Sequence, residues 1–387
     1  MDFSLTEEQQ MLKSNVRKFL EAEIAPVVDE HEKKGPLTKA EATAFIRQLM
    51  PFGYLLGFLP EECGGSSLEA KTNGILVEEL GRVWASLAGT IFIAAGFFWL
   101  LNEAGNPDQK KRLMPLAASG DYIGCLAITE PDVGSDVSGV KTLAALTGDH
   151  YVVNGTKTWI SNGTIADAAF VLATTDRTLG ALGMSFFLVE RNQSPFEARE
   201  LHKLGLRCFP TSELSFSDCR VPKENLLDPG MGYKRTMAFF DVSRAMVGAL
   251  CSGISQAAID ASVKYAQERM QFGKPIGSFQ MIQEMIVDMV AETEASRLLS
   301  FRALDLLDKK EKCRWQSSLA KAYATEAAVR TTSKAIQVHG AMGLSDEYPV
   351  ERYFRDARTL TIPDGTTQMQ KLIVGRDITG IRAMTGL

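Results

Sequence analysis

Four polar, glycine-containing segments carry the side chains in this sequence that could do chemistry. The first, Thr129–Asp136, follows an apolar run and combines hydroxyls, carboxylates and turn residues. Such a loop can present O–H and backbone N–H groups to a ring or a phosphate. The same composition is also typical of an ordinary turn that binds nothing. Composition alone therefore favours a plain turn, with a binding loop as the alternative.

The second and third segments contain the residues best suited to an extended aromatic or charged ligand. Trp159, in Lys157–Gly163, could supply a flat wall against an aromatic cofactor, although a tryptophan in a strand usually packs into the core. Arg269, in Glu268–Pro275, could pair with a pyrophosphate. A cation at that place is equally explained by the favourable dipole at a helix end.

The fourth segment, residues 337–368, contains His339 and Asp364. A histidine in a helix is more often a structural residue than a catalyst. Asp364 lies between Pro363 and Gly365, which is the setting of a turn residue, so by itself it is a weak candidate for a general base. The chain has no GxGxxG or GxxxxGK motif, and a nucleotide bound here would not use a Rossmann or P-loop cradle.

Composition and charge restrict the class of protein. The chain has 387 residues, of which 45% are hydrophobic and 23% charged, and its net charge is −5. This is an ordinary globular balance, and the charge argues against the broad phosphate-binding surface that a nucleic acid needs. The six cysteines form no CxxC pair and no Cys/His cluster. We therefore expect reduced thiols, with neither a metal site nor a disulfide framework.

The N-terminus and the longest apolar stretch bear on location. Residues 1–10 are acidic and lack a basic and an apolar region, so they resemble neither a signal peptide nor a transit peptide. We expect a cytoplasmic bacterial protein, or one of the mitochondrial matrix if a presequence has been removed. The apolar stretch Leu87–Leu101 is shorter than the ~20 residues of a membrane span. We expect it to form a buried helix and expect no membrane span.

Periodicity predicts helices at both ends of the chain. Up to about residue 120 apolar residues recur at helical spacing, and Thr6 with Gln9 predicts a capping box at the first helix. Beyond Gly232 the helical period returns in segments long enough to suggest a bundle.

Between these helical parts, short apolar runs predict strands. Thr147–Asp149 reads as a turn, and Asn154–Gly155 is a strong local signal for a hairpin. We expect an α+β protein that is mainly α, divided into residues 1–121, 122–229 and 230–387.

Taken together, the segments resemble the acyl-CoA dehydrogenase family over nearly the whole chain. The blocks that fall in the family's order and spacing are Glu78–Arg82, Thr129–Asp136, Trp159–Gly163, Leu204–Arg207, Glu268–Lys274 and Arg355–Arg358. One block would be weak evidence, but the ordered set is specific. The resemblance implies an N-terminal helical domain, a middle β-barrel-like domain and a C-terminal four-helix bundle, assembled as a homotetramer.

The resemblance also implies FAD, bound between the middle domain and the bundle and extended toward a neighbouring subunit. In similar proteins the positions of Thr129 and Ser135 lie by the isoalloxazine, and those of Trp159 and Ser161 line it. Arg269, Gln271 and Phe272 would meet the adenosine diphosphate part, and Gln337 and Gly340 would contact the same FAD from the adjacent subunit. Thr366 and Gln368 are the remaining positions at which the resemblance implies contact with FAD.

The positions that match the family's substrate contacts are Ser135, Asp241, Arg244 and Gly365. Where the family commonly has Tyr-Glu-Gly-Thr with glutamate as the catalytic base, this chain has Pro363-Asp364-Gly365-Thr366. The family's second place for the base holds Ser243, which has no carboxylate. Asp364 is thus the only carboxylate at a matching position. It is one methylene shorter than glutamate, and Pro363 removes an aromatic wall beside it.

The activity that the resemblance implies is α,β-dehydrogenation of an acyl-CoA thioester. Asp364 would remove the α-proton, the β-hydrogen would leave as hydride to flavin N5, and an electron-transfer flavoprotein would accept the electrons. The departure from glutamate favours a cyclic substrate such as cyclohexane-carboxyl-CoA, or a branched one. A linear short-chain acyl-CoA is the family default. A catalytically silent FAD- or acyl-CoA-binding relative, a flavin oxidase and a reductase are the alternatives.

Overall fold

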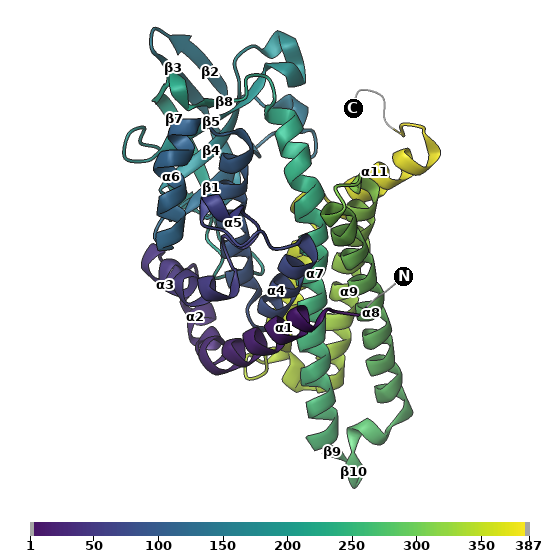
Figure 1. Cartoon of the computed structure of the whole chain (residues 1–387). Helices are drawn as coiled ribbons and strands as arrows, with labels where there is room; N and C mark the ends of the chain where they lie inside the picture. Colours follow the sequence, from purple (N-terminus) through teal and green to yellow (C-terminus); the bar gives the residue numbers. More distant parts are fainter. Residues whose placement is uncertain (1–3, 384–387) are drawn as a thin grey trace.

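The computed structural model describes residues 4–383, in which helices are followed by strands and again by helices (Figure 1). The N-terminal helices are α1 (Glu7–Phe19), α2 (Val28–Lys34), α3 (Lys39–Leu49), α4 (Ala70–Val83), α5 (Ala85–Ala104) and α6 (Pro107–Ser119). The strands are β1 (Gly124–Ala127), β2 (Leu143–Thr147), β3 (His150–Ser161), β4 (Ala168–Thr174), β5 (Met184–Glu190), β6 (Glu197–Glu200), β7 (Thr211–Pro222) and β8 (Leu226–Leu227). The C-terminal part contains α7 (Gly232–Glu268), the short strands β9 (Met270–Gln271) and β10 (Lys274–Pro275), and α8 (Gln280–Asp308), α9 (Arg314–His339), α10 (Val350–Leu360) and α11 (Thr367–Thr379). The expected fold class is confirmed.

The N-terminal helices begin and pack largely as their sequence predicts. Thr6 caps α1, and both hydrogen bonds of its capping box with Gln9 are present. The apolar stretch forms α5, which has 20 residues, so it is not too short to span a membrane as its sequence suggested. Both α5 and α7 meet the length and composition of a membrane span, yet most of each is buried inside the protein. That burial is what a core helix shows.

The strands form one mixed sheet in the order β6-β7-β3-β2-β4-β5-β8, with β1 beside β4. The predicted turn at Thr147–Asp149 joins β2 to β3. The predicted hairpin at Asn154–Gly155 is wrong, because both residues lie inside β3, where the pairing register with β7 shifts. Gly155 has a φ of +153°, and the Asn154 side chain exchanges two hydrogen bonds with Asp218 of β7. A β-bulge uses the same residue types as a tight turn.

The bundle is built around α7, which packs against α8 and α9, while α10 and α11 cover α9. The β9–β10 hairpin projects from the end of the bundle opposite to α11 (Figure 1). All six cysteines are free thiols.

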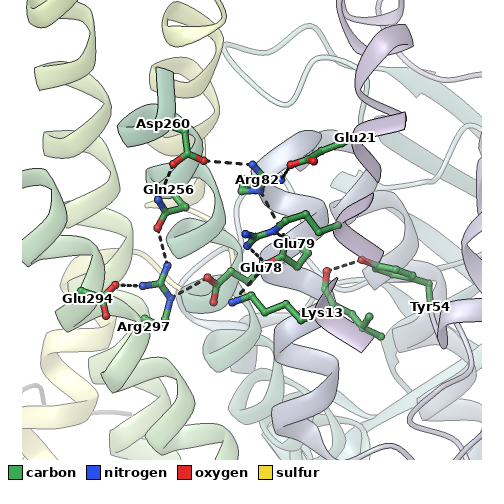
Figure 2. A network of polar contacts seen from close by, with 12 residues as sticks. Lys13, Glu21, Tyr54, Glu78, Glu79, Arg82, Gln256, Asp260, Glu294 and Arg297 are labelled. Atoms are coloured by element: carbon green, nitrogen blue, oxygen red, sulfur yellow. Dashed lines mark hydrogen bonds and ion pairs between the residues drawn. The ribbon is translucent and has the colours of Figure 1, made fainter. Parts of the chain in front are cut away.

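A polar network fixes the N-terminal helices to the bundle (Figure 2). Glu79 of α4 is buried and accepts hydrogen bonds from Arg17 of α1 at 2.7 and 2.8 Å. The neighbouring Glu78 accepts from Arg297 of α8 at 2.9 Å, and Arg297 also reaches Gln256 of α7. The Glu78–Arg82 block of the sequence therefore joins the N-terminal helices to the helices of the bundle.

Candidate active site

A cavity of about 370 Å³ lies between the sheet and the C-terminal helices. The predicted site residues that line it are Thr129, Ser135, Trp159, Ser161, Arg244, Asp364, Gly365 and Thr366. They come from the loop after β1, the end of β3, the helix α7 and the segment between α10 and α11. Four parts of the sequence, the first and last more than two hundred residues apart, thus meet at one place.

Trp159 forms an exposed wall of this cavity rather than a part of the core. A second register shift in β3, between Lys157 and Ile160, places Trp159 at a φ of +59° and leaves the residue 58% exposed. A bulge re-aims a side chain in this way, and a large residue at positive φ marks strain that is often kept at functional sites. The indole therefore offers its surface to a ligand, with Thr129, Ser135 and Ser161 lining the same cavity.

The loop that carries Thr129 and Ser135 is held by a buried ion pair. Lys157, which is fully buried, donates to Glu130 at 2.8 Å and to the Ile128 carbonyl at 2.9 Å. Glu130 also accepts from the Thr142 hydroxyl at 2.6 Å. Burial lowers the pKa of Lys157 to about 8, while Glu130 opposes that effect. Burial also opposes ionisation of Glu130, but Lys157 and Thr142 hold the pKa of its carboxyl below the ordinary value.

Asp364 also lines the cavity, from the turn between α10 and α11. Its φ is +56°, a conformation that aspartate tolerates better than most residues. Its carboxylate oxygen Oδ2 accepts a hydrogen bond from the hydroxyl of Ser243. The sequence pointed to Ser243 only as a position without a carboxylate, so this contact is new.

Side chains from three helices hold the backbone of the same turn. The Asp364 carbonyl accepts from Arg244 at 3.1 Å and from Gln370 at 2.9 Å. The Gly365 carbonyl accepts from Gln370 at 2.8 Å and from Lys321 at 2.6 Å. Sequence reasoning missed Lys321 and Gln370, which carry no local signal because each acts on a residue of another element.

Two buried cations therefore lie beside Asp364. Burial lowers the pKa of Lys321 to about 8, although nearby Asp364 favours the charged form. Burial also lowers the pKa of Arg244, opposed by Asp241 and then by Asp364. Asp241 does not line the cavity, but its carboxylate lies 3.6 Å from the guanidinium of Arg244, which does. Burial raises the pKa of Asp241, and Arg244 offsets this.

The rest of the cavity lining is mainly apolar or charged. Its apolar residues include Ile93, Leu126, Phe239 and Phe240. Phe239 packs against Phe92 and Trp99 of α5, so this wall is continuous with the core. The charged lining residues are Arg244, Arg314, Arg376, Arg382, Asp136 and Asp364. The combination suits a ligand with an uncharged end and an anionic end.

The remaining predicted cofactor residues are not part of this cavity. Arg269, Gln271 and Phe272 lie at or beside the β9–β10 hairpin, and Gln337 and Gly340 lie at the end of α9. All five are exposed, and both groups lie at one end of the bundle, because His339 stacks on Tyr265 of α7 at 4.4 Å. Arg269 follows Arg244 along α7, and a rise of ~1.5 Å per residue places them ~37 Å apart. Gln368 is exposed at the start of α11.

The cavity residues fit the isoalloxazine of FAD. A planar ring needs a flat apolar face beside it and hydrogen-bonding groups around its edge. The exposed Trp159 and the nearby hydroxyls of Thr129, Ser135 and Ser161 supply these features.

Comparison with family models gives three matches that follow one another along the chain. The acyl-CoA dehydrogenase N-terminal domain matches residues 6–121, the middle domain matches residues 125–219, and the C-terminal domain matches residues 230–379.

Individual proteins match over almost their full length. The chain is 38% identical over 374 residues to the mitochondrial short-chain specific acyl-CoA dehydrogenase of Mus musculus, covering 96% of this chain and 90% of the relative. It is 37% identical over 388 residues to a glutaryl-CoA dehydrogenase of Desulfococcus multivorans, covering 99% of each. Its fold matches butyryl-CoA dehydrogenase from Megasphaera elsdenii with a TM-score of 0.92 at 34% identity, covering 98% of this chain and 100% of that one.

Proposed function

Because this chain belongs to the acyl-CoA dehydrogenase family and is an FAD-dependent enzyme, we propose that it oxidises an uncharged, cyclic or branched acyl-CoA with Asp364 as the base. The observation that carries the proposal is the position of Asp364. Its carboxylate borders the cavity that Trp159 lines, on a turn whose backbone three side chains hold in place.

The first chemical step is removal of the α-proton of the thioester. The carbonyl group acidifies this proton, and Asp364 accepts it as general base. Within residues 4–383 the backbone N–H of Asp364 has no protein acceptor, so it is available to the thioester oxygen as enolate charge develops. Arg244 and Gln370 keep that N–H in position by fixing the carbonyl of the same residue. Bound FAD supplies the oxidising power by accepting a hydride.

The cavity lining supports an uncharged acyl group. Aspartate is one methylene shorter than glutamate, and the exposed Pro363 beside Asp364 carries no aromatic ring. Both features leave space for a ring or a branch in the substrate. The apolar wall of Ile93, Leu126 and Phe239 has no charged side chain that would pair with a second carboxylate. The arginines that line the cavity suit the phosphates of CoA.

An anaerobic substrate panel tests this assignment. We expect cyclohexane-carboxyl-CoA or a branched acyl-CoA to bleach the bound FAD fastest, butyryl-CoA more slowly, and glutaryl-CoA least, because its distal carboxylate would be buried unpaired. The rate of loss of flavin absorbance in stopped flow measures the order. Fastest bleaching by glutaryl-CoA would contradict an uncharged substrate, and fastest bleaching by butyryl-CoA would replace the cyclic or branched assignment with a linear one.

We further propose that the exposed end of the bundle contacts the FAD of a neighbouring subunit in a homotetramer. The distance of ~37 Å along α7 is too great for Arg269 and the cavity of its own chain to hold one cofactor through direct contacts. The sequence analysis expected a contact with the neighbouring subunit's FAD only for Gln337 and Gly340. The proposal assigns the same contact to Arg269, Gln271 and Phe272. An electron-transfer flavoprotein is the proposed acceptor of the electrons.

Phe272 gives a direct test of that arrangement because it is 91% exposed in the single chain. Phe272→Ala should weaken FAD retention about 3- to 10-fold, the range of one aromatic contact, measured as the ratio of flavin to protein absorbance after gel filtration. Leu179→Ala, at an exposed position of the middle domain, is the matched control and should retain FAD fully. Equal retention by the two variants would remove Phe272 from the cofactor site.

A further inference from the structure

Ser243 differs from Ser252 and Ser262, two other buried serines of α7, in the direction of its hydroxyl. Ser252 donates to the Gly248 carbonyl at 3.0 Å and Ser262 to the Ala258 carbonyl at 2.7 Å, each four residues earlier in the same helix. This is the usual bond of a helical serine. Ser243, which is fully buried, instead donates to the Asp364 carboxylate, 121 residues away in the chain. Its hydroxyl therefore serves another element and not its own helix.

The contact involves only one of the two oxygens of the Asp364 carboxylate. Oδ2 accepts from Ser243, whereas Oδ1 has no hydrogen-bond or ion-pair partner among residues 4–383. A carboxylate held at one oxygen has a fixed rotamer and a single free oxygen for a ligand. The nearby cations Arg244 and Lys321 bond to backbone carbonyls of the turn, so they fix its main chain and not the carboxylate.

We propose that Ser243 is a positioning residue for proton removal, which fixes the short Asp364 side chain so that Oδ1 faces the substrate α-carbon. The inference rests on the proposed role of Asp364 as the base. A hydrogen bond from the helix compensates for the missing methylene by restricting the carboxylate to the orientation that reacts. Ser243 itself takes no proton from the substrate.

The test compares Ser243→Ala, Ser243→Thr and Ser252→Ala as FAD-loaded enzymes, using the acyl-CoA that reduces the flavin fastest in the panel. The alanine variant should reduce FAD roughly 10- to 100-fold more slowly, the effect of one hydrogen bond to a charged group. Its substrate Kd and FAD content should stay within about 2-fold, since the lost interaction acts on orientation and not on binding. An α-deuterated substrate should show a larger isotope effect in this variant than in the wild type.

Recovery of the rate by a conservative variant distinguishes a positioning role of the Ser243 hydroxyl from a role in packing. Ser243→Thr keeps the hydroxyl and should recover most of the rate, and Ser252→Ala should match the wild type because its hydroxyl serves its own helix. Should the alanine variant not hold FAD, Ser243→Cys replaces it, with similar volume and a weak donor. A wild-type rate for Ser243→Ala, or a threonine variant as slow as alanine, overturns the inference while leaving Asp364 as the base. A wild-type rate for Asp364→Asn overturns both.

Discussion

Asp364→Asn should lower the rate of FAD reduction by acyl-CoA by about 10²–10⁴-fold, the usual cost of losing a general base. Asparagine has nearly the same shape but cannot accept the proton. FAD content and thermal stability should stay nearly unchanged, because the hydrogen bonds of Arg244, Gln370 and Lys321 go to backbone carbonyls of the turn and not to the carboxylate. Stopped-flow absorbance of the flavin under anaerobic conditions measures the rate.

The matched control for that variant is Asp136→Asn, which changes the other carboxylate that lines the cavity. Asp136 accepts from the backbone N–H and the hydroxyl of Ser138, so its role is local to its own loop. We expect this variant to keep most of the activity. Near-normal reduction by Asp364→Asn together with a severe loss in Asp136→Asn would assign the base to Asp136.

Glu130→Gln should destabilise the protein by on the order of 3 kcal/mol, because it leaves the fully buried ammonium of Lys157 without its counter-charge. The amide oxygen of glutamine can still accept one of the hydrogen bonds, which keeps the loss at the lower end of the known range. Chemical denaturation of the FAD-loaded enzyme, followed by circular dichroism, measures the change. The loop that carries Thr129 and Ser135 should loosen as well, and FAD should be retained less well.

The pH dependence of this loss has a definite sign. The folded-state pKa of Lys157 is lowered to about 8 from the ordinary 10.5, so between these values the unfolded chain binds more protons than the folded one. Stability that depends on Lys157 therefore increases as the pH rises through this window. The loss of stability caused by Glu130→Gln should be largest below pH 8. It should be smaller above pH 8, where Lys157 of the wild type also loses its proton.

Two controls accompany the measurement. Asp132→Asn removes an exposed ion pair with Lys141 and should change stability little. The double variant Glu130→Gln with Lys157→Met removes both charges and should recover most of the loss. A double variant as unstable as the single one would show that the charge of Lys157 is not the cause.

The sequence predicted the features that depend on local pattern. The capping box at Thr6, the turn at Thr147–Asp149 and the order of helical and β parts follow from residue types a few positions apart, and all are present. The hairpin at Asn154–Gly155 failed because the same dipeptide suits a bulge. Only the pairing of β3 with β7, together with the bonds between Asn154 and Asp218, decides between the two.

The parts of the site that the sequence did not predict depend on contacts between distant elements. Lys321 lies in an alanine-rich helix where a lysine ordinarily faces water, yet it is buried against the Gly365 carbonyl. Ser243 has no local signal for its bond to Asp364. The sequence by itself favoured a core position for Trp159, and only the shifted register of β3 exposes it. Local sequence motifs therefore identify the positions of the site residues, whereas the partners of their side chains follow only from the packed fold.

If Asp364 takes the α-proton of an acyl-CoA, the enzyme should also catalyse exchange of that proton with solvent. The FAD-loaded enzyme is incubated anaerobically in D₂O with the preferred acyl-CoA, and deuterium in the recovered thioester is located by mass spectrometry. We predict that the wild type introduces deuterium at the α-carbon and not at the β-carbon, and that Asp364→Asn introduces essentially none. Exchange at the wild-type rate in Asp364→Asn would contradict the claim.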